Sequence, residues 1–141
     1  MSTIYYIEND ENDVFLLRMA FKREGYVGFI RHFERIDDFK AAMERADSER
    51  PKAFLFDLKL NGESGLDALQ WVREHPELSV IPAFLFSSGS IPDEILKSMD
   101  LEVSAYIFKP MSRAGWAEVV NYLADAAGLQ KNAVFAEREK L

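Results

Sequence analysis

Residues 53–57 read Ala53-Phe54-Leu55-Phe56-Asp57, four apolar residues followed by a single carboxylate. A short continuous apolar run of this kind is typical of a strand that is buried on both faces of a parallel sheet. In an open α/β sheet, ligands bind in the crevice outside the carboxyl ends of the strands. This stretch therefore predicts a buried strand that carries Asp57 to a functional site at the edge of the sheet.

Three further apolar runs show the same pattern, because charged, amide or hydroxyl residues come directly after each of them. The runs are residues 4–7, 83–86 and 105–108, and the polar residues after them are Glu8, Asn9 and Asp10, then Ser87 and Ser88, then Lys109. Residues 28–33 are a weaker strand candidate. Because parallel strands share one carboxyl edge, the sequence predicts that acids, hydroxyls and an amine meet there.

Helical patterns alternate with these strands. Val14, Leu17 and Phe21 recur at helical spacing, with Asp13 as the expected N-cap and Gly25 as the expected end. Similar patterns predict helices within four later stretches, residues 39–46, 66–72, 92–99 and 116–123. Five strand-helix repeats with short connections predict an α/β fold, a five-stranded parallel sheet with helices on both faces.

The composition is that of one globular domain. The chain has 141 residues, 48% of them hydrophobic, which suffices for a single core without disulfide or metal staples. The absence of cysteine excludes thiol chemistry and zinc–thiolate sites, and suits a cytoplasmic location. A net charge of −7 without a basic cluster argues against nucleic acid as a partner. No apolar run approaches the roughly 18 residues that span a bilayer, so no membrane contact is expected.

Four motifs of this chain resemble, in their order and separations, those of the receiver domain of response regulators from two-component signalling. The motifs are residues 7–10 after the first strand, residues 56–65 after the third, Ser87-Ser88 after the fourth and Lys109-Pro110 after the fifth. The resemblance covers residues 3–127 and implies the flavodoxin-like strand order 2-1-3-4-5. Residues 128–141 are then a C-terminal extension.

The resemblance implies that Asp57 is the nucleophile that accepts a phosphoryl group from a kinase phosphohistidine. Lys109 is expected to place its ammonium against the phosphoryl group, and to pair with Asp57 in the unmodified state. Ser87 matches the hydroxyl residue that bonds a phosphoryl oxygen. Tyr106 matches the switch aromatic, which swings inward when that hydroxyl moves. Pro110 matches the proline at which the family has a cis peptide bond that aims the lysine, and the sequence leaves the isomer of this bond open.

The resemblance also implies a Mg²⁺ site, because the family binds this cation beside its phosphoacceptor. The expected ligands are Glu8, Asn9, Asp57 and the backbone carbonyl of Lys59, with Asp10 as a further candidate. Mg²⁺ takes oxygen ligands in octahedral geometry and keeps several waters. This chain departs from the family at Asn9, which stands where the family has its second acid and brings no charge. The affinity for Mg²⁺ is therefore expected to be lower than that of a three-acid pocket.

Two interpretations of function follow. The first is a single-domain response regulator, a phosphoacceptor signalling protein rather than an enzyme, that works with a histidine kinase. Residues 8–14 look like those of regulators paired with phytochrome-type kinases. The alternative is a pseudo-receiver, a binding module that is not phosphorylated, and Asn9 favours it. A dehalogenase-like phosphatase would need a second Asp two residues after Asp57, where this chain has Lys59.

The extension carries Val134 and Phe135 beyond the point at which the core is complete. Full burial of side chains of this size stabilises a protein by about 1.5–3 kcal/mol each. We therefore expect residues 128–141 to form an arm that two chains exchange in a homodimer. A frayed end and packing of the arm on its own chain are the alternatives.

Overall fold

The computed structural model describes residues 3–27, 29–45, 49–89 and 101–131. Its main sheet contains five parallel strands, β1 (Thr3–Ile7), β2 (Phe29–Phe33), β3 (Ala53–Asp57), β6 (Ala83–Ser87) and β7 (Ala105–Phe108). The strands lie side by side in the order β2-β1-β3-β6-β7. This confirms the predicted order 2-1-3-4-5 and places Asp57 at the end of the central strand.

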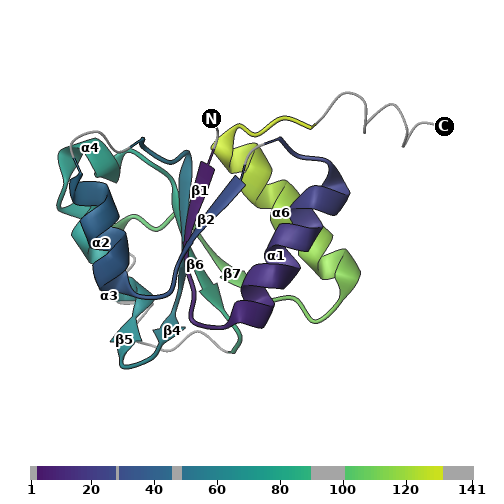
Figure 1. Ribbon diagram of the computed structural model, residues 1–141, viewed down its shortest axis with the longest axis horizontal. Coiled ribbons are helices and arrows are strands. Elements are labelled where there is room, and N and C mark those ends of the chain that lie inside the picture. Colours follow the sequence, from purple (N-terminus) through teal and green to yellow (C-terminus); the bar gives the residue numbers. More distant parts are fainter. Residues whose placement is uncertain (1–2, 28, 46–48, 90–100, 132–141) are drawn as a thin grey trace.

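Helices cover both faces of the sheet (Figure 1). On one face lie α1 (Glu11–Glu24) and α6 (Arg113–Ala127), and on the other lie α2 (Ile36–Glu44), α3 (Gly65–Arg73) and the short α4 (Pro76–Ser79). Each face buries its own apolar cluster, because successive residues of a strand point to opposite sides. Tyr5 packs in the cluster under α2 and α3, whereas Tyr6 packs in the cluster under α1 and α6.

The start of α1 differs from the prediction. The N-cap is Asp10, whose side chain accepts a hydrogen bond from the Asn12 backbone N–H at 2.9 Å. Asp13, the expected cap, lies in the first turn of the helix instead. The helix begins earlier because Val14 N–H already bonds to the Asp10 carbonyl at 3.2 Å. Its end is confirmed at Gly25, which caps the helix with a φ of 80°.

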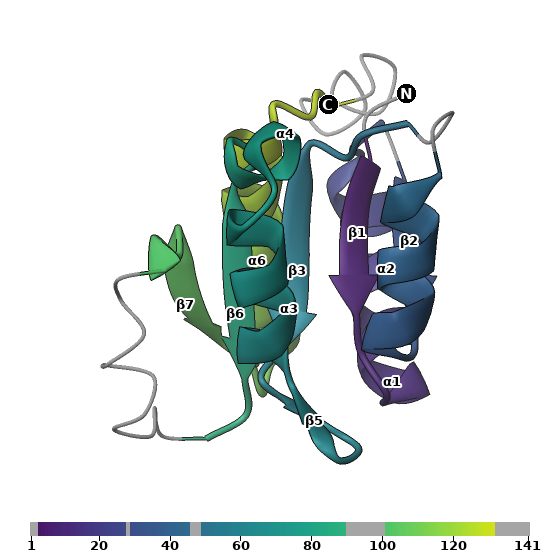
Figure 2. The ribbon, with the colours of Figure 1, turned by 90° about the vertical axis from the view of Figure 1, so that its left-hand side faces the viewer.

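Two short features were not predicted from the sequence. One is α4, and the other is a hairpin of β4 (Lys59–Leu60) and β5 (Glu63–Ser64) that projects from the carboxyl edge of the sheet (Figure 2). Both are too short to show a hydrophobic period. The helix expected over residues 92–99 lies outside the described residues, as do Gly28, Ala46, Val134 and Phe135.

The first residues of the expected extension pack on their own chain. The Val27 N–H donates to the Gln130 carbonyl at 2.8 Å, and Lys131 forms an antiparallel bridge with Tyr26. Leu129 contacts the apolar cluster under α1 and α6. Residues 128–131 are therefore continuous with the domain. Among the helices of the described ranges, none has the length and apolarity needed to cross a membrane.

Candidate functional site at the carboxyl edge of the sheet

Four of the predicted polar residues arrive at one edge because of the strand register. Glu8 directly follows β1, Asp57 ends β3 and Ser87 ends β6. Asp57 is opposite Phe86, one residue before Ser87, and Ser87 is opposite Phe108, one residue before Lys109. Glu8, Asp57 and Ser87 are the charged or hydroxyl residues of this edge that are almost fully buried, with exposed fractions of 0, 4 and 6%.

Lys109 is the central cation of this cluster. Its Nζ lies 2.8 Å from Glu8 Oε1, 2.7 Å from Asp13 Oδ2 and 3.5 Å from Asp57 Oδ2. Burial lowers the pKa of Lys109, but the hydrogen bonds to Asp13 and Glu8 outweigh burial and raise the pKa above its usual value. The ammonium therefore stays charged and balances one of three carboxylates.

The surroundings of Asp57 disfavour the charged form of its carboxylate. Burial raises its pKa, and the nearby carboxyl of Glu8 raises it further. Lys109 and the backbone N–H of Lys59 act in the opposite sense but do not cancel the rise. Asp57 thus sits in a site with an excess of negative charge, which favours the binding of a cation.

Gly65, the first residue of α3, packs directly under Asp57. Its N–H donates to the Leu58 carbonyl at 3.1 Å, which brings its Cα against the end of β3. A Cβ at Gly65 would lie only 2.3 Å from the backbone carbonyl oxygen of Asp57. A glycine is therefore required at this position for the helix to approach the phosphoacceptor candidate so closely.

Glu8 is anchored by a residue that the sequence reasoning missed. Tyr6, fully buried two residues earlier, donates its hydroxyl to Glu8 Oε1 at 2.5 Å. The second oxygen, Oε2, is buried and has no hydrogen-bond partner within the described part of the chain. Burial and the negative charge of Glu8 raise the pKa of Tyr6, so its hydroxyl keeps its proton and remains a donor.

The oxygens that could hold a divalent cation are those of Glu8 and Asp57. An unsatisfied buried carboxylate oxygen is costly, and a hard cation would satisfy it, so the residues present fit Mg²⁺. Asn9 follows Glu8 and is half-buried, whereas Asp10 is exposed and caps α1. In the described ranges, no three His, Asp or Glu side chains are already arranged around a cation position.

Ser87 and Tyr106 lie on neighbouring strands. Ser87 Oγ is within 3.3–3.4 Å of the backbone N and O of Gly89, so its hydroxyl is engaged with the following loop. Tyr106 is half-buried, pairs with Leu85 across the strands, and packs against the cluster under α2 and α3. It also lines a cavity of about 370 Å³ together with Phe108 and Tyr122.

The Lys109–Pro110 bond, whose isomer the sequence left open, is trans, as are the other peptide bonds of the described residues. The trans form is the more stable one even before proline.

Asp13 is the second residue of the site that was missed. The signal that would have found it is its place three residues after the N-cap Asp10, because side chains in the first turn point back toward the start of the helix.

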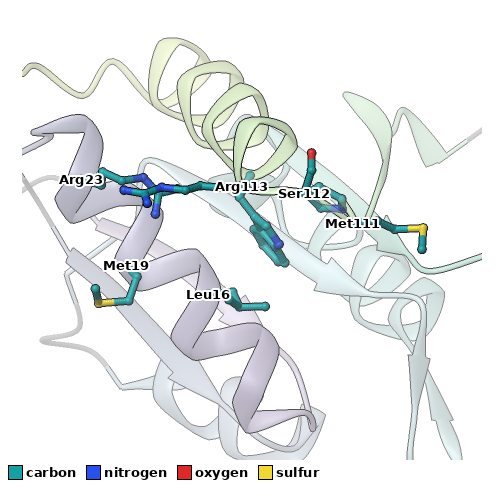
Figure 3. Close-up of a pocket in the computed structure, with 8 residues that line it drawn as sticks. Leu16, Met19, Arg23, Met111, Ser112 and Arg113 are labelled. Carbon is teal, nitrogen blue, oxygen red and sulfur yellow. The ribbon is translucent and has the colours of Figure 1, made fainter.

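A pocket of about 370 Å³ opens between α1 and the segment that joins β7 to α6 (Figure 3). Leu16, Met19 and Trp116 give it an apolar wall, and Met111 is fully exposed at its rim. Arg23 and Arg113 supply positive charge on a chain that is negative as a whole. Pro110, one of its lining residues, directly follows Lys109 in the chain.

Comparison with known proteins gives a consistent picture. The family model of the response regulator receiver domain matches residues 4–121. The polar-differentiation response regulator DivK of Brucella anthropi is 26% identical over 125 residues, which cover 88% of this chain and 98% of DivK.

Two solved structures share the fold. The phosphorylated cyanobacterial phytochrome response regulator RcpA has a TM-score of 0.77 and 24% identity, over 88% of this chain and 91% of RcpA. The Mn²⁺-bound form of the response regulator Rcp1 has a TM-score of 0.76 and 21% identity, over 89% of this chain and 93% of Rcp1.

Proposed function

We propose, from the premise that this chain belongs to the response regulator receiver domain family, that Asp57 accepts a phosphoryl group in a two-component phosphorelay. The observation that carries the proposal is the position of Asp57: it ends the central strand, buried, with the Lys109 ammonium 3.5 Å away and Glu8 beside it. Phosphoryl transfer needs an aligned acceptor and positive charge against the phosphoryl oxygens. Asp57 and Lys109 match these two requirements.

Each remaining residue of the cluster has a role in this proposal. Mg²⁺, held by Glu8 and Asp57 with Asn9 and the Lys59 carbonyl, would neutralise charge on the phosphoryl oxygens. The Ser87 hydroxyl would donate to a phosphoryl oxygen, and Tyr106 is the proposed switch residue. The Mn²⁺-bound Rcp1 and the phosphorylated RcpA are related structures in keeping with such a site.

The proposed phosphodonor is a histidine kinase, of the phytochrome type. The likeness to the phytochrome response regulator RcpA supports this choice. A phosphohistidine can reach Asp57 only if the donor protein lies against the carboxyl edge of the sheet. The pocket lined by Pro110 and Met111 is proposed as part of the surface that such a donor would face, and the exposed Met111 offers apolar contact.

The proposed output is contact with another protein by a single-domain regulator, since 125 aligned residues span 98% of the relative DivK. The domain would comprise residues 3–127, with residues 128–141 as an extension whose arm joins two chains in a homodimer. Gln130 and Lys131 already pair with Val27 and Tyr26, so the exchanged part would begin after Lys131.

The pseudo-receiver remains the second candidate because Asn9 is neutral at a position where the proposed cation site would otherwise have a carboxylate. Intact mass spectrometry after incubation with acetyl phosphate and MgCl₂, and separately with a phytochrome-type kinase and ATP, distinguishes the two. We expect one added phosphoryl group on the wild type and on the exposed-site control Asp37→Asn, and none on Asp57→Asn. A wild type that stays unmodified with both donors establishes the pseudo-receiver, and full labelling of Asp57→Asn excludes Asp57 as the acceptor.

A further inference from the structure

Tyr6 is a buried polar residue that has no role of its own in the proposed phosphoryl transfer. Its side chain has no exposed surface, and its ring packs on Phe86 and His32 at centroid distances of 6.1 and 6.4 Å. If this strand position only had to fill an apolar cluster, phenylalanine would pack there as well as tyrosine. The hydroxyl is instead directed at Glu8, where it donates to Oε1 at 2.5 Å.

Glu8 is held at every polar atom except one. Its N–H donates to the Phe33 carbonyl at 3.0 Å, and its own carbonyl lies 2.6 Å from His32 Nε2. Its Oε1 receives both the Tyr6 hydroxyl and the Lys109 ammonium, the latter at 2.8 Å. Among the described residues, only Oε2 is left without a partner. The carboxylate therefore presents a single oxygen to any cation beside it.

The two donors on Oε1 differ in how they respond to a cation. The Lys109 ammonium carries a positive charge, so a divalent ion repels it, and Asp13 offers it another partner at 2.7 Å. The Tyr6 hydroxyl is neutral and is not repelled. Tyr6 is thus the donor that keeps Oε1 occupied when a cation is present.

A carboxylate restricted to one oxygen suits some cations better than others. Mg²⁺ is small, demands octahedral geometry and binds carboxylates while keeping several waters, whereas Ca²⁺ takes six to eight oxygens and often both oxygens of a glutamate. We infer that Tyr6 is a positioning residue that restricts Glu8 to a one-oxygen contact and so makes the site select a small octahedral cation over Ca²⁺. This inference rests on the proposed function, in which Glu8 is a cation ligand.

Calorimetric titration of the full, unphosphorylated chain with MgCl₂ and with CaCl₂ tests the inference. Removing a hydrogen bond to a ligating side chain typically weakens metal binding 10- to 100-fold, so Tyr6→Phe is expected to lose about tenfold in Mg²⁺ affinity. Ca²⁺ affinity should fall less, because Oε1 becomes available to it, so the Mg²⁺/Ca²⁺ preference decreases. Tyr5→Phe is the matched control: its hydroxyl bonds to the Glu49 carbonyl on the opposite face of the sheet.

A second variant keeps the test decisive if Tyr6→Phe does not fold, which thermal unfolding in EDTA would show. Tyr6→Met also removes the hydroxyl, with a flexible side chain that adapts to the apolar cluster, and the same loss of preference is expected. An unchanged Mg²⁺/Ca²⁺ ratio in the folded variants, an equal loss in Tyr5→Phe, or a wild type that binds neither cation overturns the inference. Labelling of Asp57 is scored separately by mass, so a failed inference leaves a phosphorylated Asp57 standing.

Discussion

The Asp13 carboxylate accepts a hydrogen bond from the Lys109 ammonium at 2.7 Å, although the two residues lie 96 positions apart in the chain. Asp13 thereby joins Glu8 and Asp57 as a third carboxylate around one ammonium. Asn9, which the resemblance places at the position of the family's second acid, is neutral. Asp13 therefore restores part of the negative charge that Asn9 removes, from the first turn of α1 rather than from the end of β1.

Asp13→Asn should weaken Mg²⁺ binding severalfold. Without Asp13, the carboxylates of the described residues that remain beside the Lys109 ammonium are Glu8 and Asp57, so the ammonium competes with the cation for them. The site also loses a negative charge. Calorimetric titration with MgCl₂ measures the effect. Glu11→Gln removes the same charge from an exposed position of the same helical turn and should bind Mg²⁺ almost as the wild type does. Equal affinities of Asp13→Asn and wild type would show that Lys109 does not compete with the cation.

Asp57→Asn should stabilise the metal-free protein at neutral pH. Burial and Glu8 raise the pKa of Asp57 in the folded state above its unfolded value, so the folded state binds more protons and stability falls as the pH rises. Replacing the carboxylate removes this cost, which we put at about 2 kcal/mol. The gain should shrink as the pH is lowered to 4, where the unfolded chain also becomes protonated.

Urea unfolding in EDTA at pH 4 and pH 7.5 measures this difference. Asp37→Asn, in the exposed first turn of α2, is the control with the opposite sign, because an acid there stabilises the start of a helix by about 0.5 kcal/mol. A lower stability of Asp57→Asn than of wild type at pH 7.5 would contradict the charge excess described for the site.

Asn9→Asp should tighten Mg²⁺ binding by about five- to tenfold, because it adds a unit charge next to Glu8 at the proposed cation site. Asn12→Asp adds the same charge at an exposed position of α1 and is expected to change the affinity much less. Calorimetry or tryptophan fluorescence can follow both titrations. Equal or weaker binding by Asn9→Asp would mean that Asp13 or another group already supplies the missing charge.

Gly65→Ala should destabilise the protein by about 2 kcal/mol or more, because the added Cβ meets the Asp57 backbone oxygen and one of them must move. Displacement of Asp57 should also slow its labelling by acetyl phosphate. Gly89→Ala is the matched control, since a Cβ there has no atom within 4 Å. Urea unfolding and timed mass spectra test both effects. Wild-type stability and labelling of Gly65→Ala would show that α3 can shift away from β3 without cost.

The proposed dimer should depend on residues 132–141. Light scattering on the full chain and on a version that ends at Lys131 tests this, because the shorter chain keeps the contacts of residues 130 and 131 with Tyr26 and Val27. We expect a dimer for the full chain and a monomer for the shorter one. A monomeric full chain, or a dimer that survives the truncation, would rule out the exchanged arm.

Much of the fold could be predicted because its signals are local. The apolar runs 53–56 and 83–86 are long enough, and free enough of polar residues, to be recognised as buried strands, and the cap at Gly25 ends α1 as expected. The positions of Asp57, Ser87 and Lys109 at strand ends follow from the same pattern. The pattern did not predict the hairpin β4–β5 or the helix α4, because elements of two to four residues are too short to show a hydrophobic period.

The sequence by itself determined which residues reach the carboxyl edge of the sheet. The strands are parallel, so the polar residues that follow the apolar runs all lie at that same edge. It did not determine how their charges pair. The contact of Asp13 with Lys109 depends on the angle at which α1 packs on the sheet, and the hydrogen bond from Tyr6 to Glu8 depends on the side-chain rotamers that the packing allows. Those are set by packing between residues far apart in the chain, so only the tertiary structure decided them.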